Sequence, residues 1–288
     1  MNILVTGAKG FIGQSLTKDL SNNHTVYALA RSFEKNSTLK NLIHIEHDFN
    51  KPLDSNRLPE KIDAVIHLAQ SSQYRNFPEG MRDMVAVNLL GLTEVLDYAK
   101  AADCDYFINF SSGSVYDPSN PDQSETANLN PRAAYPLTKF MSEKLVDLYQ
   151  GFFKTLNVRL FFPYGPGQEG MLIPNLINSV KQGNPIGLQG NQGGLELCPI
   201  YISDVVSICT TLLGAQTTGV LNVGGNEQLR LETIGNEIGA AIGKPASFNV
   251  DVAATPALFR PSLDRMQKLL AEHEFVSFKE GINRVVSD

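Results

Sequence analysis

The sequence predicts an α/β protein built on a doubly wound parallel sheet, with a smaller helix-rich lobe attached. Short apolar runs rich in β-branched residues alternate with amphipathic stretches in the first half of the chain, which is typical of βαβ units. Around residue 163 the pattern changes, because Gly and Pro become frequent at 163–167 and again at 183–194. The length of 288 residues suffices for one large α/β domain with an appendage.

The individual elements follow from the same periodicities. Strands are expected near residues 2–6, 24–30, 42–46, 63–68, 105–110 and 156–162. Helices are expected between them near 11–21, 82–102 and 133–153, and later near 172–182, 203–214, 231–242, 262–271 and 278–286. We therefore predict a sheet domain over 1–165 and a lobe over 166–288, with the chain returning to the main sheet near 200–225. Such a sheet binds its ligands at the carboxyl ends of its strands.

Composition argues against several classes of partner. A net charge of −6 provides no basic field for phosphate polymers, so we expect no binding to nucleic acid or to an anionic membrane. The sequence opens on an apolar strand and contains no apolar run of bilayer-spanning length, which predicts a cytoplasmic protein. Cys104, Cys198 and Cys209 form neither an even framework nor a Cys-x-x-Cys pair, so neither disulfides nor a metal site is expected.

A glycine-rich segment follows the first expected strand and opens the first helix. Three glycines at this spacing permit a tight turn, close approach of the backbone to a pyrophosphate, and tight packing of helix on strand. Its position at the start of a βαβ unit predicts a Rossmann dinucleotide site. The residues assigned to that site are Gly7, Lys9, Gly10, Phe11, Ile12 and Gly13.

The ends of the second and third strands bear on the choice of dinucleotide. An acidic residue usually ends the second strand of an NAD site, but this chain reads Ala30-Arg31-Ser32. Arg31, helped by Lys9, can clamp a 2′-phosphate, so the sequence favours NADP over NAD. The alternative is that Arg31 is a solvated loop residue or stacks on adenine. Asp48 is either a partner of the adenine amino group or an ordinary turn acid.

Tyr135 and Lys139 form a candidate acid/base pair. Four residues apart on a helix, their phenol and ammonium lie on one face, one turn apart. A free tyrosine with a pKa of about 10 is a poor base at neutral pH. An ammonium about 4 Å away, at an effective dielectric of about 20, is expected to lower the pKa of Tyr135 by about three units. The serines that follow the fifth strand, from Ser111 to Ser114, can bind the reacting oxygen.

Together these features resemble the extended short-chain dehydrogenase/reductases, in particular the NAD(P)-dependent epimerase/dehydratase group that includes UDP-galactose 4-epimerase and the nucleotide-sugar reductases. The resemblance runs nearly end to end. It rests on the glycine segment 7–13, His67-Leu68-Ala69, Asn88 within 87–91, the segments 111–116 and 135–139, Tyr164-Gly165-Pro166-Gly167, and Tyr201-Ile202-Ser203-Asp204-Val205. It implies that Tyr135 is the general acid/base, that Lys139 lowers its pKa and holds the nicotinamide ribose, and that Ser112 orients the reacting oxygen.

The remaining predicted site residues complete this assignment. The cofactor site is expected to include Asp48, Phe49, Leu68, Ala69, Asn88, Tyr135, Lys139 and Pro163, in addition to Arg31 and the glycine segment. The substrate site is expected to include Ser71, Ser112, Gly113, Ser114, Phe162 and Arg260. Arg260 matches a phosphate-binding arginine of the family.

Three departures from the family pattern bear on which reaction and which substrate are expected. Nucleotide-sugar dehydratases carry an Asp-Glu pair where this chain has Gly113 and Ser114, so dehydration lacks its second acid/base pair. Many nucleotide-sugar binders have an asparagine where this chain has Phe161-Phe162-Pro163. A second phosphate-binding arginine is replaced by Leu197, which weakens the assignment of a nucleotide-sugar.

The sequence thus predicts an NADP-dependent oxidoreductase that transfers hydride to or from a nucleotide-linked keto-sugar. A 4-epimerase with tightly bound NAD is the alternative, because it uses the same residues twice with no net change of cofactor. A carbonyl reductase for a non-nucleotide substrate, or a non-catalytic cofactor-binding protein, is the second alternative.

The resemblance also implies a homodimer that pairs through the helices near 82–102 and 133–153. An apolar stripe on the first of these helices would serve that interface. The same stripe is equally well explained as core packing against the sheet. Its members are Val85, Leu89, Leu92, Val95 and Leu96.

Overall fold

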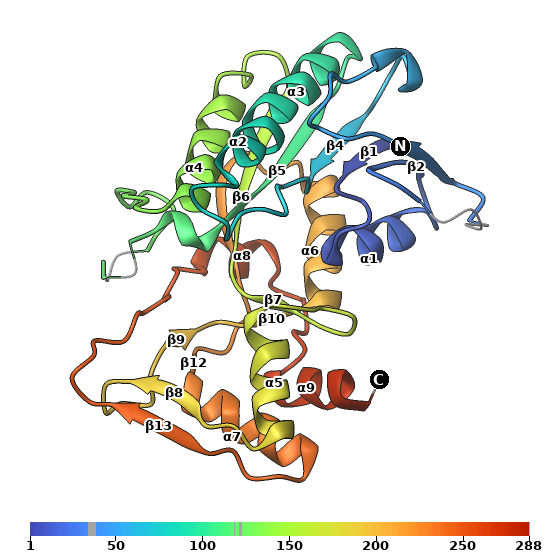
Figure 1. Cartoon of the computed structure of the whole chain (residues 1–288). Coiled ribbons are helices and arrows are strands. Elements are labelled where there is room, and N and C mark those ends of the chain that lie inside the picture. The colour runs from blue at the N-terminus through green and yellow to red at the C-terminus, as the bar shows by residue number, and fades with distance from the viewer. Residues whose placement is uncertain (34–38, 118, 121–122, 288) are drawn as a thin grey trace. The chain divides into compact units, whose positions relative to one another are not determined.

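The computed structural model describes residues 1–33, 39–117, 119–120 and 123–287, which fold into two compact units (Figure 1). The first unit comprises residues 1–115, 129–159 and 206–221. The second comprises residues 116–128, 160–205 and 222–288. Each unit therefore takes its chain from several separate stretches of the sequence.

A seven-stranded sheet forms the centre of the first unit. Its order is β11-β6-β5-β4-β1-β2-β3, and the pairings from β5 to β3 are parallel. The strand bounds are β1 Asn2–Thr6, β2 Thr25–Ala30, β3 Leu42–Glu46, β4 Ala64–His67, β5 Tyr106–Ser112, β6 Lys154–Leu160 and β11 Gly219–Val223. The strand order reverses between β1 and β4, which is the switch point of a doubly wound sheet. The predicted Rossmann fold class is confirmed.

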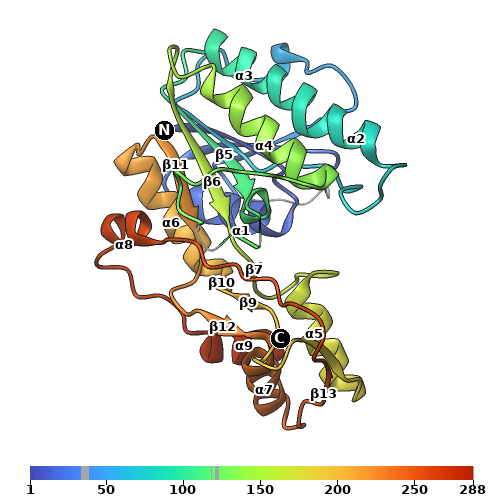
Figure 2. The same cartoon turned by 90° about the vertical axis from the view of Figure 1, so that its left-hand side faces the viewer.

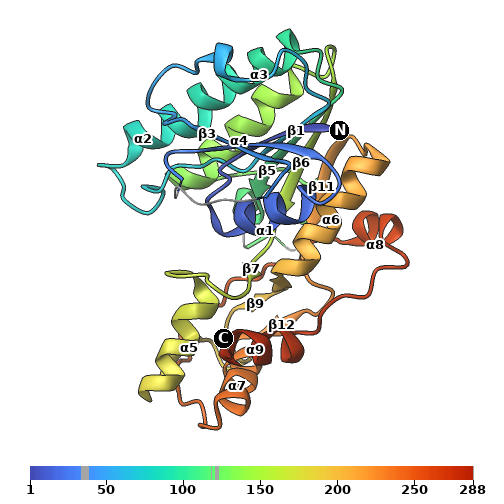
Figure 3. The same ribbon diagram turned by 90° about the vertical axis from the view of Figure 1, so that its right-hand side faces the viewer.

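Helices cover both faces of this sheet (Figures 2 and 3). One face carries α2 Met81–Val85, α3 Gly91–Ala101 and α4 Ala134–Asp147, and the other carries α1 Phe11–Leu20 and α6 Ile202–Ala215. The helix expected near 82–102 is interrupted, because a π-helical stretch, η2 Ala86–Leu90, joins α2 to α3. Single π-turns of this kind often mark functional sites.

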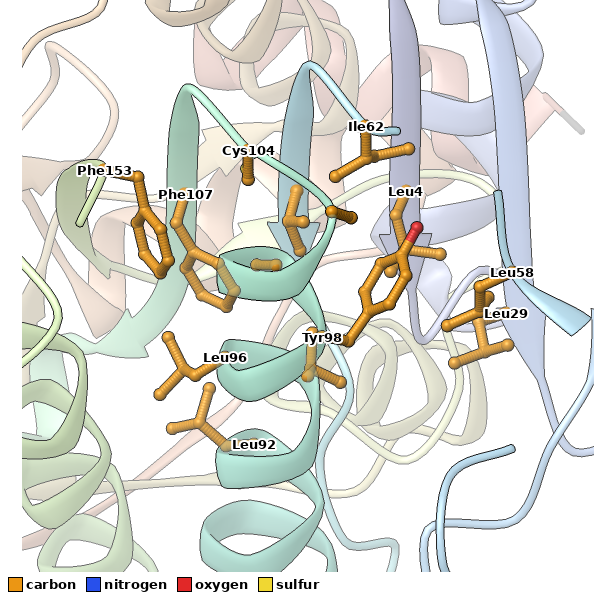
Figure 4. Packing of buried hydrophobic residues seen from close by; sticks show 14 of the residues in the cluster. Leu4, Leu29, Leu58, Ile62, Leu92, Leu96, Tyr98, Cys104, Phe107 and Phe153 are labelled. Carbon is orange, nitrogen blue, oxygen red and sulfur yellow. The ribbon is translucent and has the colours of Figure 1, made fainter. Parts of the chain in front are cut away.

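An apolar cluster lies between α3 and the sheet (Figure 4). Leu92, Val95 and Leu96 of α3 are fully buried there, against residues such as Leu4 and Phe107 of the strands. Burial of Val/Leu side chains contributes about 1.5–3 kcal/mol each. These three members of the predicted stripe therefore serve the core.

The second unit is built from short strands and four helices among its described residues. Its strands are β7 Pro163–Tyr164, β8 Ile186–Gln189, β9 Glu196–Leu197, β10 Ile200–Tyr201, β12 Leu229–Arg230 and β13 Phe248–Asp251. Its helices are α5 Leu172–Gln182, α7 Leu231–Ile242, α8 Asp264–Leu269 and α9 Phe278–Ser287. Two 3₁₀ turns complete the first unit, η1 Ser55–Arg57 and η3 Gly113–Val115.

Two general features limit the chemistry of the chain. All three cysteines are buried as free thiols, and burial raises the pKa of each to about 12. Within the described ranges, no helix combines the length and apolar character needed to cross a bilayer.

Candidate active site

The glycine segment forms the turn between β1 and α1. Gly7 adopts a positive φ of 67°, and a Cβ there would lie 2.8 Å from the backbone nitrogen of Ala69. A Cβ on Gly13 would lie 2.3 Å from the carbonyl oxygen of Gly7. Both positions therefore exclude any side chain, and the amide of Gly10 closes the turn by donating to the carbonyl of Gly7 at 2.8 Å.

A cavity of about 360 Å³ opens beside this turn, at the carboxyl ends of the strands. The predicted cofactor or substrate residues that line it are Gly7, Lys9, Gly10, Arg31, Asp48, Phe49, Leu68, Ala69 and Ser71. Further lining residues, including Gln70, Asn50 and Asp83, were not anticipated from the sequence. The size and polar rim of this cavity suit part of a dinucleotide.

Asn88 has a different position from the lining residues. It is buried on η2, where its Oδ1 accepts from the amide of Ser71 at 2.8 Å and its Nδ2 donates to Thr138 at 3.0 Å. Asn88 thus ties the loop after β4 to helix α4. Phe11, Ile12 and Gly13 belong to the first turns of α1, behind the glycine turn.

The strand ends that line the cavity are charged. Arg31 and Lys9 contribute two cations, and Asp48 contributes one anion. The amide of Asn50 donates to Asp48 and lowers the pKa of that carboxyl. The three described residues that directly follow β2, Arg31, Ser32 and Phe33, include no acid, and Asp83 is a second acidic residue of the lining.

Ser112, Tyr135 and Lys139 come together in the first unit. Ser112 ends β5, and the other two lie in the first two turns of α4. Pro136 is tolerated in that first turn because its missing amide would have no helical partner. The Tyr135 hydroxyl is hydrogen-bonded to Ser112 and donates to Gln70 Oε1 at 3.2 Å. Because Gln70 lines the cavity, the phenol lies within hydrogen-bond reach of its wall.

The acid strength of this pair differs from the sequence prediction. Burial raises the pKa of Tyr135 to about 12, against a smaller lowering by the Ser112 hydrogen bond. Burial likewise lowers the pKa of Lys139 to about 8. The expected lowering of the tyrosine pKa by Lys139 is therefore wrong for this structure, since desolvation of the phenolate is the largest effect on that pKa and raises it.

Ser114 and Gly113 occupy the turn after Ser112. The hydroxyl of Ser114 donates to Ser112 Oγ at 2.9 Å, and its amide approaches the same oxygen at 3.2 Å. These contacts fix the Ser112 hydroxyl at the end of β5. No carboxylate stands at either position, as the sequence indicates.

Arg260 belongs to a charged cluster in the second unit. Its guanidinium makes a two-pronged ion pair with Glu196, at 2.5 and 2.6 Å. Arg230, which faces Glu196 across the β9–β12 pair, contacts the same carboxylate at 2.7 Å. Leu197 is fully buried. Sequence reasoning missed Glu196 and Arg230, because only the strand pairing brings them together.

Phe162 is the second predicted substrate residue of this unit, and it follows β6 in a strained backbone conformation. Its φ is +42°, a region that side chains of this size rarely adopt. Its ring packs edge-on against Phe259 at 5.2 Å. Pro163 follows as the first residue of β7.

In the described part of the chain, no three His, Cys, Asp or Glu side chains are grouped so that they could hold a metal ion. His67, the one histidine in the family-like segments, accepts or donates one hydrogen bond with Thr6 at 3.0 Å.

The doubly wound sheet, the glycine turn and the Ser-Tyr-Lys arrangement define an enzyme of the short-chain dehydrogenase/reductase type. Residues 3–224 match the model of the NAD dependent epimerase/dehydratase family. The chain belongs to that family.

Individual relatives are similar over the whole of this chain. The chain is 29% identical to the uncharacterized UDP-glucose epimerase YtcB of Bacillus subtilis, covering 100% of this chain and 97% of the relative. It is 25% identical to UDP-glucuronic acid decarboxylase 1 of Arabidopsis thaliana, covering 100% and 69%. Among solved structures, UDP-glucuronic acid 4-epimerase from Bacillus cereus, in complex with UDP-glucuronic acid and NAD, superposes with a TM-score of 0.85 at 26% identity, covering 100% and 98%.

Proposed function

We propose that this protein is a nucleotide-sugar 4-epimerase, which oxidises the C4 hydroxyl of a nucleotide-linked sugar and reduces the ketone from its other face. One observation carries the proposal: the Tyr135 hydroxyl is bound to Ser112 and to Gln70 of the cavity wall. The similarity to a UDP-glucuronic acid 4-epimerase supports this alternative over the keto-sugar reductase that the sequence favoured.

The proton steps fall to three side chains. The Tyr135 phenolate removes the proton of the sugar hydroxyl and returns it after the sugar turns over, while Ser112 donates a hydrogen bond to the same oxygen. The ammonium of Lys139 stabilises the phenolate. A nicotinamide dinucleotide, when bound, supplies the hydride acceptor and donor.

We propose that a cluster in the second unit binds the substrate's phosphates. Arg260 and Arg230 share the carboxylate of Glu196, so this cluster retains one net positive charge by formal count. Arginine forks suit phosphate oxygens. Arg230 thereby supplies a cation that Leu197 lacks, which restores support for a nucleotide-sugar.

For an epimerase we propose NAD as the cofactor, because a recycled cofactor gains nothing from a 2′-phosphate. The solved relative from Bacillus cereus contains NAD. NADP remains the second candidate on one specific observation: Arg31 and Lys9 both line the cavity, and the described residues directly after β2, at 31–33, include no acid.

We also propose a homodimer. Leu90, Leu137 and Met141 leave 61%, 40% and 45% of their surfaces exposed on η2 and α4. These helices lie on one face of the sheet in the first unit. Exposed apolar side chains on neighbouring helices suit a two-fold interface. Sedimentation of Leu137→Glu beside the native chain tests this, and an unchanged mass would contradict it.

The decisive experiment incubates the purified protein with NAD and either UDP-glucose or UDP-glucuronic acid, and follows the sugar by proton NMR. We expect the C4 epimer to accumulate with no net NADH. Net oxidation of NADPH by a keto-sugar would instead establish the reductase, and loss of the C6 carboxylate as CO₂ would establish a decarboxylase. No turnover with bound dinucleotide would favour a non-catalytic role.

A further inference from the structure

Helix α4 carries a third polar residue on the face that bears Tyr135 and Lys139. Glu143 follows Lys139 by four residues, so the three side chains form one stripe along the helix. Burial increases along that stripe: Tyr135 is half-buried, Lys139 is 4% exposed, and Glu143 is fully buried. The stripe therefore runs from the cavity wall into the protein interior.

The carboxylate of Glu143 joins three elements of the first unit. It accepts from Ser111 Oγ of β5 at 2.5 Å, and from Arg159 Nε and Nη2 of β6 at 3.1 and 2.8 Å. Ser111 directly precedes Ser112 in β5. One carboxylate thus connects the helix of the proton-transfer pair to the strand end that presents the serine.

The buried Arg159–Glu143 ion pair is not explained by a contribution to the stability of the fold. Arg159 and Glu143 are 4% and 1% exposed at their side chains. Taking two charges out of water costs several kcal/mol per ion, and apolar residues of the same volume often stabilise such a position better. A role for the charge itself accounts for its presence beneath α4.

We propose that Glu143 is a positioning residue for the reaction: its carboxylate keeps Lys139 an ammonium and fixes the Ser111-Ser112 strand end to α4. The proposal rests on the function proposed above. Glu143 is buried away from the residues that line the cavity, so it acts through Lys139 and Ser112.

Among the described residues, the other charged and titratable groups around Lys139 supply no negative charge that would stabilise its ammonium. His67 of β4 is uncharged at neutral pH, since burial and then Lys139 lower its pKa to about 3. Tyr135 is a neutral phenol, and Arg159 is a cation that Glu143 neutralises. Glu143 is thus the anion that raises the pKa of Lys139, against the larger effect of burial.

The charge of Glu143 also favours the productive distribution of protons. It lies one turn from Lys139 and two turns from Tyr135, so its field acts more strongly on the ammonium. Removing it lowers the proton affinity of Lys139 more than that of Tyr135. The phenolate–ammonium form that takes the sugar proton then becomes rarer relative to the phenol–amine form.

The test uses Glu143→Gln and, because that change removes the carboxylate that pairs with the buried Arg159, the neutral pair Glu143→Gln/Arg159→Met. Lysine labelled with ¹³C at Cε reports the titration of Lys139 without substrate, and a Lys139→Met sample identifies the signal. We expect a midpoint near 8 in the native chain, a midpoint about one pH unit lower in Glu143→Gln, and a smaller lowering in the neutral pair, where the Arg159 charge is removed as well. A lowering of about one pH unit roughly halves the ammonium fraction at pH 7 and lowers it about fivefold at pH 8, so we expect kcat to fall by about these factors and the limbs of its pH profile to move to lower pH.

Two controls separate charge from packing. Asp147→Asn removes a carboxylate from the next turn of the same stripe, where Asp147 accepts from Asn157 at 3.0 Å, and should leave the Lys139 midpoint unchanged. Glu143→Asp keeps the charge and should keep the midpoint. An unchanged midpoint in folded Glu143→Gln variants, or a shifted midpoint with unchanged kcat, would overturn the proposal. Turnover by Tyr135→Phe would instead overturn the proposed function, while the midpoint still reports on Glu143.

Discussion

One face of strand β5 contacts two different buried environments, one apolar and one polar. Phe107 belongs to the apolar cluster under α3, whereas Asn109 and Ser111, two and four residues further, belong to a polar layer under α4. In that layer Asn109 binds Asn157 at 2.9 Å, and Ser111 binds Glu143. The same face therefore changes from apolar to charged as it approaches the carboxyl edge of the sheet.

The comparison teaches how this unit separates stability from chemistry. The apolar cluster is held by buried area, which is non-directional and tolerant of detail. The polar layer depends on hydrogen-bond geometry, and each unpaired member would be costly. We expect substitutions in the cluster to change the free energy of unfolding, and substitutions in the layer to change kcat.

The largest effect is expected for Tyr135→Phe, at the cavity end of the layer. Loss of the hydroxyl removes the acid/base, so kcat should fall about 10²–10⁴-fold. Dinucleotide affinity and the free energy of unfolding should stay close to native values. Steady-state turnover with calorimetric cofactor binding measures both, and near-native kcat would break the assignment.

Leu96→Ala is the matching change in the apolar cluster. Leu96 is fully buried, so its truncation should cost about 2–5 kcal/mol of unfolding free energy by transfer and cavity terms. Turnover per folded molecule should not change. Urea denaturation measures the first quantity, and Leu148→Ala, at a position 75% exposed, is the control. A large fall in kcat at full folding would contradict the separation.

Lys139→Met tests whether the layer costs stability. The folded pKa of about 8 lies below the ordinary lysine value of 10.5, so between these values the unfolded chain binds more protons, and stability rises with pH. At pH 7 the buried ammonium costs up to about 3 kcal/mol. The methionine variant should be more stable at pH 7, with the advantage fading towards pH 10.5, and inactive. Denaturation at pH 7 and 10 checks this; a pH-independent difference would refute it.

The smallest effect is expected at the solvent-facing rim, for Arg31→Asp. An acid in place of Arg31 repels a 2′-phosphate, so NADPH affinity should fall about tenfold or more. NADH affinity should change little or improve. Titration of both dinucleotides measures the difference, and equal weakening of the two would remove Arg31 from cofactor selection.

The apolar half of this comparison was largely predictable. Residues 2–6, 42–46 and 172–182 have the predicted bounds in the structure, because strand and helix periods are visible in the sequence. The positions of Tyr135 and Lys139 on a helix were equally visible. The fifth strand, in contrast, was predicted to end at residue 110, whereas β5 continues to Ser112.

The polar half depends on contacts that no local pattern contains. Glu143, Ser111 and Arg159 come from three separate segments, and Gln70 reaches Tyr135 across 65 residues of sequence. Burial also reversed the predicted direction of the Tyr135 pKa shift, since desolvation depends on everything packed around the phenol.

The π-helical turn η2 sets the rotation of α3 relative to the residues before it, and two groups of contacts depend on that rotation. Within it Asn88 must face inward to bind Ser71 and Thr138, and beyond it Leu92 and Leu96 must face the sheet. A regular α-helix advances about 100° per residue, so removing a single residue here would rotate one set out of place. Shortening this segment by one residue would therefore either break the Asn88 contacts between α4 and the loop after β4 or turn Leu92 and Leu96 away from the core.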